Sequence, residues 1–103
     1  MQELLFEWDG QKNRANIIKH GISFEEAATV FYDPAGVLFD DPDHSAEEER
    51  FLIIGMSETL NLLIVSHCIR NGDAIRIISA RKANKKECTV YVRFGAYGGK
   101  NER

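Results

Sequence analysis

The stretch that decides the fold is Ala74-Ile75-Arg76-Ile77-Ile78-Ser79-Ala80-Arg81-Lys82. Its β-branched and apolar residues predict a strand inside a sheet. Because charges are rarely buried without partners, its three cations should reach the surface of that sheet or pair there. Strict alternation would place Arg81 on the face of Ser79, and Arg76 with Lys82 on the other face. Unless a bulge interrupts the strand, Arg76 and Arg81 therefore cannot serve one site.

The region before this stretch contains three more apolar runs. The acidic residues 40–49 follow the first run, and the later connections are short. Asn71-Gly72 is a strong hairpin signal, and the connection at 57–61 is short enough for another hairpin. The apolar runs are nearly continuous, which is typical of a sheet covered on both faces. We therefore expect a four-stranded antiparallel meander, with strands at residues 36–39, 50–56, 62–67 and 75–81.

The N-terminal third predicts a strand and two helices. The strand is expected at 4–8 and the first helix at about 10–20, where Asp9 can cap its start and Gly21 its end. Ser23-Phe24-Glu25-Glu26 is a capping box that opens the second helix.

The C-terminal part predicts one more helix, opened by Asn84-Lys85-Lys86-Glu87, although 88–94 also carries residues that favour a strand. The fold class is therefore α+β. We expect a single domain over 1–94 and a flexible tail over 95–103.

Charge is unevenly distributed along the chain. The net charge is −3, but residues 40–49 hold six acidic residues and no Lys or Arg. From Cys68 to the end there are nine Lys or Arg residues against three acidic ones, which is a balance of +6. Such asymmetry suggests an anionic partner for the C-terminal part, although random scatter of charge in a small domain is an equal alternative.

Composition and motifs exclude several classes of protein. No apolar run is long enough for a membrane span, and the N-terminus lacks the features of a signal peptide, so we expect a cytoplasmic protein with free thiols at Cys68 and Cys88. There is no nucleophile elbow, phosphate-binding loop, dinucleotide fingerprint or zinc motif. The acidic run with His44 does not match a calcium loop, and we expect neither a metal nor another cofactor.

The residues that remain suit chemistry on phosphate. Cleavage of RNA through its 2′-hydroxyl needs an activated 2′-oxygen, stabilisation of the phosphorane and protonation of the 5′-oxygen. Candidate proton carriers are His20 and His67, and the available cations are Lys19, Arg50, Arg70, Arg76, Arg81 and Lys82. For His67, a structural hydrogen bond at the sheet edge is the more ordinary role. For each arginine alone, the alternative is a salt bridge to the acidic loop or to Glu87.

An ordered set of short motifs resembles the BrnT family of toxins. The set begins with Phe6-Glu7-Trp8-Asp9 and continues through Lys19-His20-Gly21, Ser23-Phe24-Glu25-Glu26-Ala27, Asp43-His44-Ser45, Glu49-Arg50-Phe51 and Arg76-Ile77-Ile78-Ser79-Ala80-Arg81-Lys82-Ala83, with Lys86-Glu87 and Tyr91. The chain departs from the family pattern after Glu87, where Cys88-Thr89-Val90 replaces a charged helical end.

The resemblance implies a RelE-like α+β fold and a ribonuclease toxin of a type II toxin–antitoxin pair. It also implies neutralisation by BrnA, a DNA-binding antitoxin, so that the toxin would meet DNA only through its partner. The basic residues expected at the family's active site map to Arg50 and Arg81, with Trp8, Lys19 and His20 nearby.

The first hypothesis is thus an endoribonuclease toxin that needs no metal. Its catalytic candidates are Arg50, Arg81, His20 and His67, and its RNA-binding candidates are Trp8, Lys19, Arg70, Arg76 and Lys82. The alternative is a toxin-like module without catalysis, which acts in complex formation with the antitoxin and in control of the operon.

Overall fold

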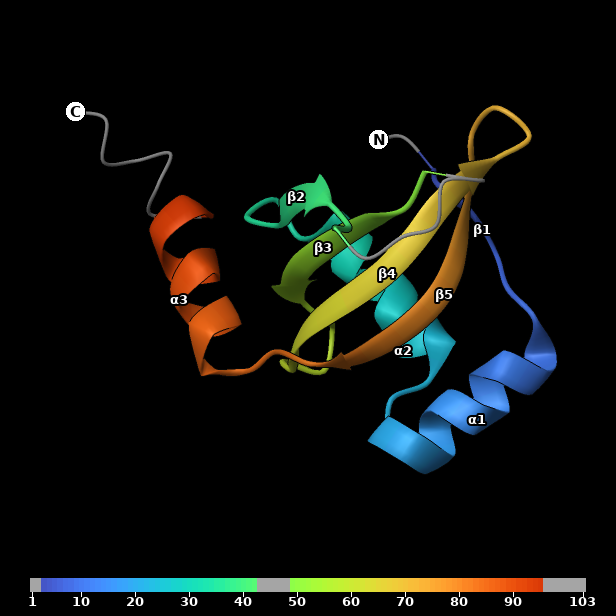
Figure 1. Cartoon of the computed structure of the whole chain (residues 1–103), viewed down its shortest axis with the longest axis horizontal. Coiled ribbons are helices and arrows are strands. Elements are labelled where there is room, and N and C mark those ends of the chain that lie inside the picture. The colour runs from blue at the N-terminus through green and yellow to red at the C-terminus, as the bar shows by residue number, and fades with distance from the viewer. Residues whose placement is uncertain (1–2, 43–48, 96–103) are drawn as a thin grey trace.

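A computed structural model describes residues 3–42 and 49–95 of the chain. Figure 1 shows a twisted sheet with α2 behind it, α1 along one side and α3 standing off at the other. The elements in chain order are β1 (Leu5–Glu7), α1 (Gly10–His20), α2 (Phe24–Thr29), the short 3-10 helix η1 (Val30–Tyr32), β2 (Val37–Asp40), β3 (Phe51–Met56), β4 (Leu62–Arg70), β5 (Ala74–Lys82) and α3 (Lys85–Phe94).

The sheet has five strands in the order β1-β5-β4-β3-β2. Strands β2 to β5 form the predicted antiparallel meander. The prediction of four strands was incomplete, because β1 joins the sheet parallel to β5 and makes it mixed. In this pairing Phe6 lies opposite Ile75, and its ring packs edge-on against Phe31 with centroids 5.4 Å apart. Apolar packing of Phe6 thus holds the short strand at the sheet edge.

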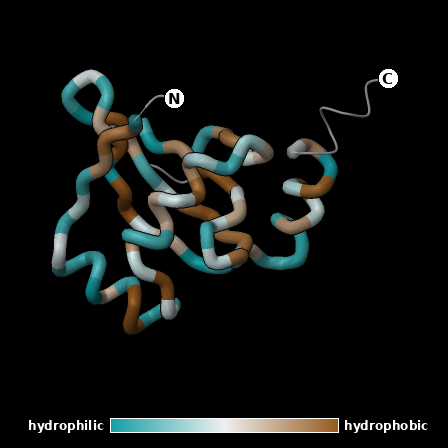
Figure 2. Tube along the Cα trace, turned by 180° about the vertical axis from the view of Figure 1, so that it is seen from behind, coloured by the Kyte–Doolittle hydropathy of each residue, from teal (hydrophilic) through white to brown (hydrophobic). Residues whose placement is uncertain are grey.

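Helix α1 is polar, and a single buried amide fixes it to the sheet. Asp9 caps its first turn through the N–H groups of Gln11 and Lys12, and Gly21 ends it in the left-handed conformation at φ 74°. Figure 2 shows how hydrophilic this helix is beside the strands. Asn16 is its one buried residue, and its carboxamide bonds both the N–H (3.2 Å) and the C=O (2.8 Å) of Ala80. Strand β1 pairs with β5 only as far as Arg76, so the backbone of Ala80 has no neighbouring strand on that side. The carboxamide of Asn16 provides the hydrogen bonds that such a strand would make.

A bulge in β5 changes which residues share a face. Ser66 lies opposite Ser79, but the next residue of β4, His67, lies opposite Ile77, so Ile78 is an extra residue. Alternation therefore shifts by one position. Arg76 and Arg81 come to lie on the same face of the sheet, which corrects the assignment from strict alternation.

The core lies between the other face of the sheet and α2. Its largest fully buried members include Phe24, Ile22, Leu63, Ile77 and Val30. The bulge leaves Ile77 and Ala80 on this face, where both are buried, and Lys82 follows them there. Burial of this apolar cluster is the main source of stability that the structure shows.

Helix α3 is the predicted last helix, and Asn84 and Glu87 form its capping box. None of its residues is fully buried, and a polar contact joins it to the rest of the fold. Tyr91 donates to Asp33 Oδ2 at 2.8 Å, and Asp33 also accepts from the Met56 N–H at 2.7 Å. Burial, followed by this bond to a carboxylate, raises the pKa of Tyr91 to about 12. The predicted tail lies outside the described residues from 96 onward, and the domain bounds remain a prediction.

Candidate functional site

A pocket of about 750 Å³ lies on the face of the sheet that α2 leaves open. Helix α3 borders one end, and the last turn of α1 borders the β5 side. The pocket gathers five basic side chains from four separate segments: Lys19, His20, Arg50, Arg81 and Lys86. Four of these were predicted site residues. A basic pocket open to solvent is suited to a phosphate-bearing ligand.

The floor of the pocket is one row of paired residues that crosses four strands. Phe39 lies opposite Leu52, Leu52 opposite Ser66, and Ser66 opposite Ser79. The row therefore changes from apolar on β2 and β3 to hydroxyl-bearing on β4 and β5. All four side chains line the pocket.

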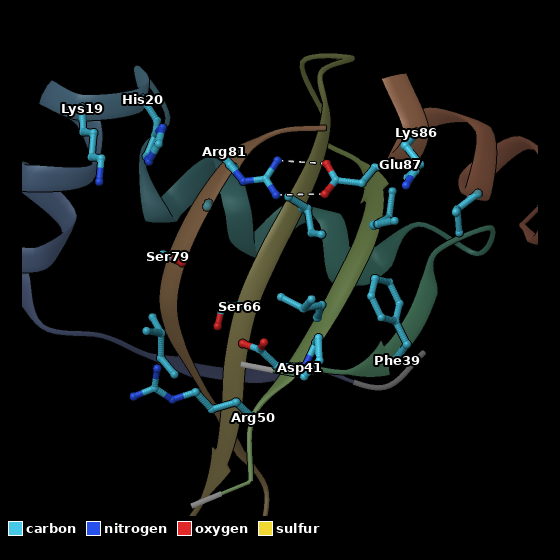
Figure 3. Close-up of a pocket in the computed structure, with 17 residues that line it drawn as sticks. Lys19, His20, Phe39, Asp41, Arg50, Ser66, Ser79, Arg81, Lys86 and Glu87 are labelled. Atoms are coloured by element: carbon cyan, nitrogen blue, oxygen red, sulfur yellow. Dashed lines mark hydrogen bonds and ion pairs between the residues drawn. The ribbon is translucent and has the colours of Figure 1, made fainter. Parts of the chain in front are cut away.

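Arg50 and Arg81 flank this row on opposite sides. Arg81 is two residues beyond Ser79, and Arg50 is two residues before Leu52 in the opposite direction along the sheet. Figure 3 shows Arg81 at one end, Arg50 at the other, and Ser66 and Ser79 between them. Four strand positions correspond to about 13 Å at ~3.3 Å per residue. The two arginines therefore share one pocket without meeting at one point.

The Arg81 guanidinium is held by Glu87 from the first turn of α3. Its Nη1 and Nη2 donate to Oε1 at 2.9 Å and Oε2 at 2.8 Å, and Nη1 also donates to the Lys82 carbonyl at 3.2 Å. The hydrogen bonds from Arg81 lower the pKa of Glu87, and those to Glu87 raise the pKa of Arg81. Because a guanidinium carries five N–H donors, Arg81 keeps donors for a second anion.

Lys19 and His20 reach the pocket because α1 ends there. The side chain of Asn16 donates a hydrogen bond to the Ala80 carbonyl and so fixes the helix to β5. Lys19 lies one helical turn further along, next to the pocket wall formed by Ser79 and Arg81. Cations in the last turn also suit the helix dipole. In Figure 3 both side chains lie on the β5 side of the pocket.

His67 does not reach the pocket. It is buried on the core face, with its ring 4.7 Å from that of Phe31 and 6.0 Å from that of Phe51. Its Nδ1 lies 3.3 Å from the Val65 carbonyl, which can only accept a hydrogen bond. Burial lowers the pKa of His67.

The other four predicted site residues also lie outside the pocket. Trp8 packs edge-on against Phe24, with ring centroids 6.1 Å apart. Arg76 shares the open face but pairs with Glu7 at 3.3 Å. Arg70 is exposed at the end of β4, far along the sheet from Arg81.

Lys82 lies on the core side of the sheet, near Glu26. Burial opposes ionisation of Glu26, but hydrogen bonds from Asn61, Ser57 and Thr59, together with the charge of Lys82, lower its pKa. This assembly closes the β3–β4 turn and does not contribute to the pocket.

The sequence did not single out several pocket residues, namely Phe39, Asp41, Ser66, Ser79, Lys86 and Glu87, as members of a site. Phe39, Ser66 and Ser79 belong together because of the register in which the strands pair, and this register depends on the bulge in β5. No group of three metal-binding side chains occurs in residues 3–42 or 49–95, and Asp43 and His44 lie outside those ranges. No helix in the same ranges is long and apolar enough to cross a membrane.

Similarity to known proteins identifies the family of this chain. The model for the ribonuclease toxin BrnT of type II toxin–antitoxin systems matches residues 8–87. The chain belongs to the BrnT family. The crystal structure of the Brucella abortus ribonuclease toxin BrnT is similar, with a TM-score of 0.61 and 25% identity over 81% of this chain and 100% of that one. No curated protein matches the sequence.

Membership of the BrnT family gives the class of activity. The family consists of ribonuclease toxins of type II toxin–antitoxin systems, which implies an RNA substrate and an antitoxin partner. The α+β architecture, with a mixed sheet and three α-helices, is similar to that of the Brucella toxin. The matched range covers every residue of the pocket lining except Val90 of α3.

Proposed function

We propose that this protein is an endoribonuclease that cuts RNA by attack of a 2′-hydroxyl on the adjacent phosphorus, without a metal. A bond forms from the 2′-oxygen to phosphorus, and the bond to the 5′-oxygen breaks. The 2′-hydroxyl proton is lost and a proton is delivered to the 5′-oxygen. The products are a 2′,3′-cyclic phosphate and a free 5′-hydroxyl.

The observation that carries the proposal is the convergence of Lys19, His20, Arg50 and Arg81 on one open pocket. Fixed cations stabilise the charge that develops on a phosphorane, and guanidinium groups bind phosphate oxygens in a forked geometry. We assign phosphorane stabilisation to Arg81, and binding of two further phosphates to Lys19 beside it and to Arg50 at the other end of the pocket.

His20 is the proposed proton carrier of the pocket. It is partly exposed at the end of α1, and an imidazole can both accept and deliver a proton near neutral pH. His67 is left out of the proposed mechanism because it is buried on the opposite face.

We also propose that a BrnA-like antitoxin neutralises the toxin, and that DNA is contacted only through this partner. The RNA substrate would place the toxin's action in the cytoplasm. A partner that covered the pocket face would block access to all four basic residues at once.

Induced expression tests the proposal in cells. Wild-type protein should arrest growth, and Arg81→Ala should abolish the arrest while the purified variant stays folded. Arg93→Ala is the matched control, because Arg93 is an exposed arginine of α3 outside the pocket. Equal toxicity of wild type and Arg81→Ala would remove Arg81 from the mechanism. Binding of RNA without cleavage by purified wild-type protein would favour the non-catalytic module.

A further inference from the structure

The open face of the sheet differs between its two sides. Lys19, His20 and Ser79 lie toward β5, whereas the apolar Phe39 and Leu52 lie toward β2, with Lys86 and Asp41 near them (Figure 3). A sheet face that stays open to solvent has no structural need for a ring at its rim. Phe39 is nevertheless 37% exposed and turned into the pocket (Figure 3).

The positions of the two arginines set the direction of a bound chain. A sugar–phosphate backbone that contacts Arg81 and Arg50 must run from one end of the pocket to the other and cross β4 near Ser66. Its bases can then point either toward α1 or toward β2. The α1 side presents Lys19, which suits phosphate, and His20, which the proposed mechanism uses as the proton carrier.

The β2 side has the chemistry that a base needs. Phe39 is the only phenyl or indole ring among the described residues that line the pocket. Its row neighbour Leu52 provides an apolar floor, and Val90 of α3 is a further apolar residue of the pocket lining. Single-stranded nucleic acids are bound by this combination of a cationic groove and an aromatic ring on which a base stacks.

We propose that Phe39, together with its cross-strand neighbour Leu52 and with Val90 of α3, forms a subsite for one nucleobase of a single-stranded substrate. The row Phe39–Leu52–Ser66–Ser79 crosses three strand spacings of ~4.8 Å each. A nucleotide lying along the row places its base over β2 and β3 and its sugar and phosphate over the two serines. The identity of the ligand as RNA rests on the proposed function, but the subsite itself requires only a single-stranded nucleic acid.

The test uses an oligonucleotide that is 2′-deoxy at every position, so that binding is measured without cleavage. One position carries 2-aminopurine, whose fluorescence falls when it stacks on a ring. Phe39→Leu keeps the apolar cover of Leu52 and removes the ring, and Phe39→Tyr restores a ring. Leu38→Ala is the control, because Leu38 is the exposed neighbour of Phe39 on the same strand and is absent from the pocket lining.

We expect wild type and Phe39→Tyr to quench the probe, and Phe39→Leu to lose the quenching and bind roughly tenfold more weakly. Leu38→Ala should bind as wild type does. Replacing the probe nucleotide by an abasic site should also weaken binding by wild type roughly tenfold. The same replacement should not weaken binding by Phe39→Leu, because that variant has already lost the stacking contact.

The outcomes separate this inference from the ribonuclease proposal. If Phe39→Leu binds and quenches as wild type does, the subsite is wrong, even when wild type still cleaves RNA. If quenching depends on Phe39 but wild type leaves RNA intact, the subsite stands and the ribonuclease proposal fails. Absence of any binding by wild type at low salt would overturn the subsite.

Discussion

Arg81 and Glu87 form a bidentate ion pair that joins the end of β5 to the first turn of α3, with N–O distances of 2.9 and 2.8 Å. Glu87 is itself fixed, because its Oε1 accepts from the Asn84 N–H at 2.8 Å in the capping box. The residue that caps α3 therefore also orients the arginine proposed to stabilise the phosphorane. This arrangement explains how a helix without buried residues can matter to the pocket.

Glu87→Gln should reduce the rate of RNA cleavage about 10- to 100-fold, because the guanidinium loses its fixed orientation. The fall should appear mainly in kcat in steady-state assays. Tyr91→Phe is the matched control, since it removes the other polar anchor of α3, the bond to Asp33. Equal losses in both variants would mean that Glu87 acts only by docking α3.

Arg50→Ala and Arg81→Ala should each make nucleic-acid binding less sensitive to salt. Each phosphate contact to a single strand contributes about 0.7 to the slope of log affinity against log salt. The slope measured with a 2′-deoxy oligonucleotide should therefore fall by about 0.7 in each variant. Arg93→Ala should leave the slope unchanged. A wild-type slope in Arg50→Ala would show that Arg50 does not contact a phosphate.

Asn16→Ala should destabilise the fold more than any exposed substitution on α1. It leaves the N–H and C=O of Ala80, and the C=O of Ile22, without the side chain that bonds them. A buried group that loses its partner costs about 1–3 kcal/mol. Denaturant unfolding of Asn16→Ala and of the exposed control Gln11→Ala measures the difference. Equal midpoints would show that the amide is not a structural link.

His67 should make the protein less stable as the pH falls. Burial holds its pKa in the folded state below the unfolded value of 6.5. Its contribution is therefore fully present above that value and is lost as the pH falls through the window below it. The free energy of unfolding should fall more steeply between pH 7 and pH 5 in wild type than in His67→Leu. Parallel curves would show that folding does not shift the pKa of His67.

The parts of the fold that the sequence predicts well are those set by neighbouring residues. Asp9 and Gly21 fix the two ends of α1 through local caps, and Asn84 does the same for the start of α3. The parallel pairing of β1 with β5 joins residues 69 positions apart, such as Glu7 and Arg76, and has no local signal. The sequence alone therefore predicts the antiparallel meander but not the parallel pairing of β1 with β5.

The site shows the same division between local and distant effects. Cations near the end of α1 and on β5 were identifiable by type, and Lys19, His20, Arg50 and Arg81 do line one pocket. The row that contains Ser79 was not, because a single extra residue at Ile78 sets the register that places Ser79 opposite Ser66. Ile78 can be recognised as an extra residue only from the pairing of β5 with β4. Ser66 of β4 lies twelve positions before Ile78 in the chain.

Cleavage of a short RNA by purified protein in the presence of a metal chelator tests attack by the 2′-oxygen. We expect fragments ending in a 2′,3′-cyclic phosphate and a 5′-hydroxyl. We expect no cleavage when the one nucleotide 5′ to the cut is 2′-deoxy, and none by Arg81→Ala. Cleavage of the 2′-deoxy substrate, or products with a 5′-phosphate, would contradict attack by the 2′-oxygen in this pocket.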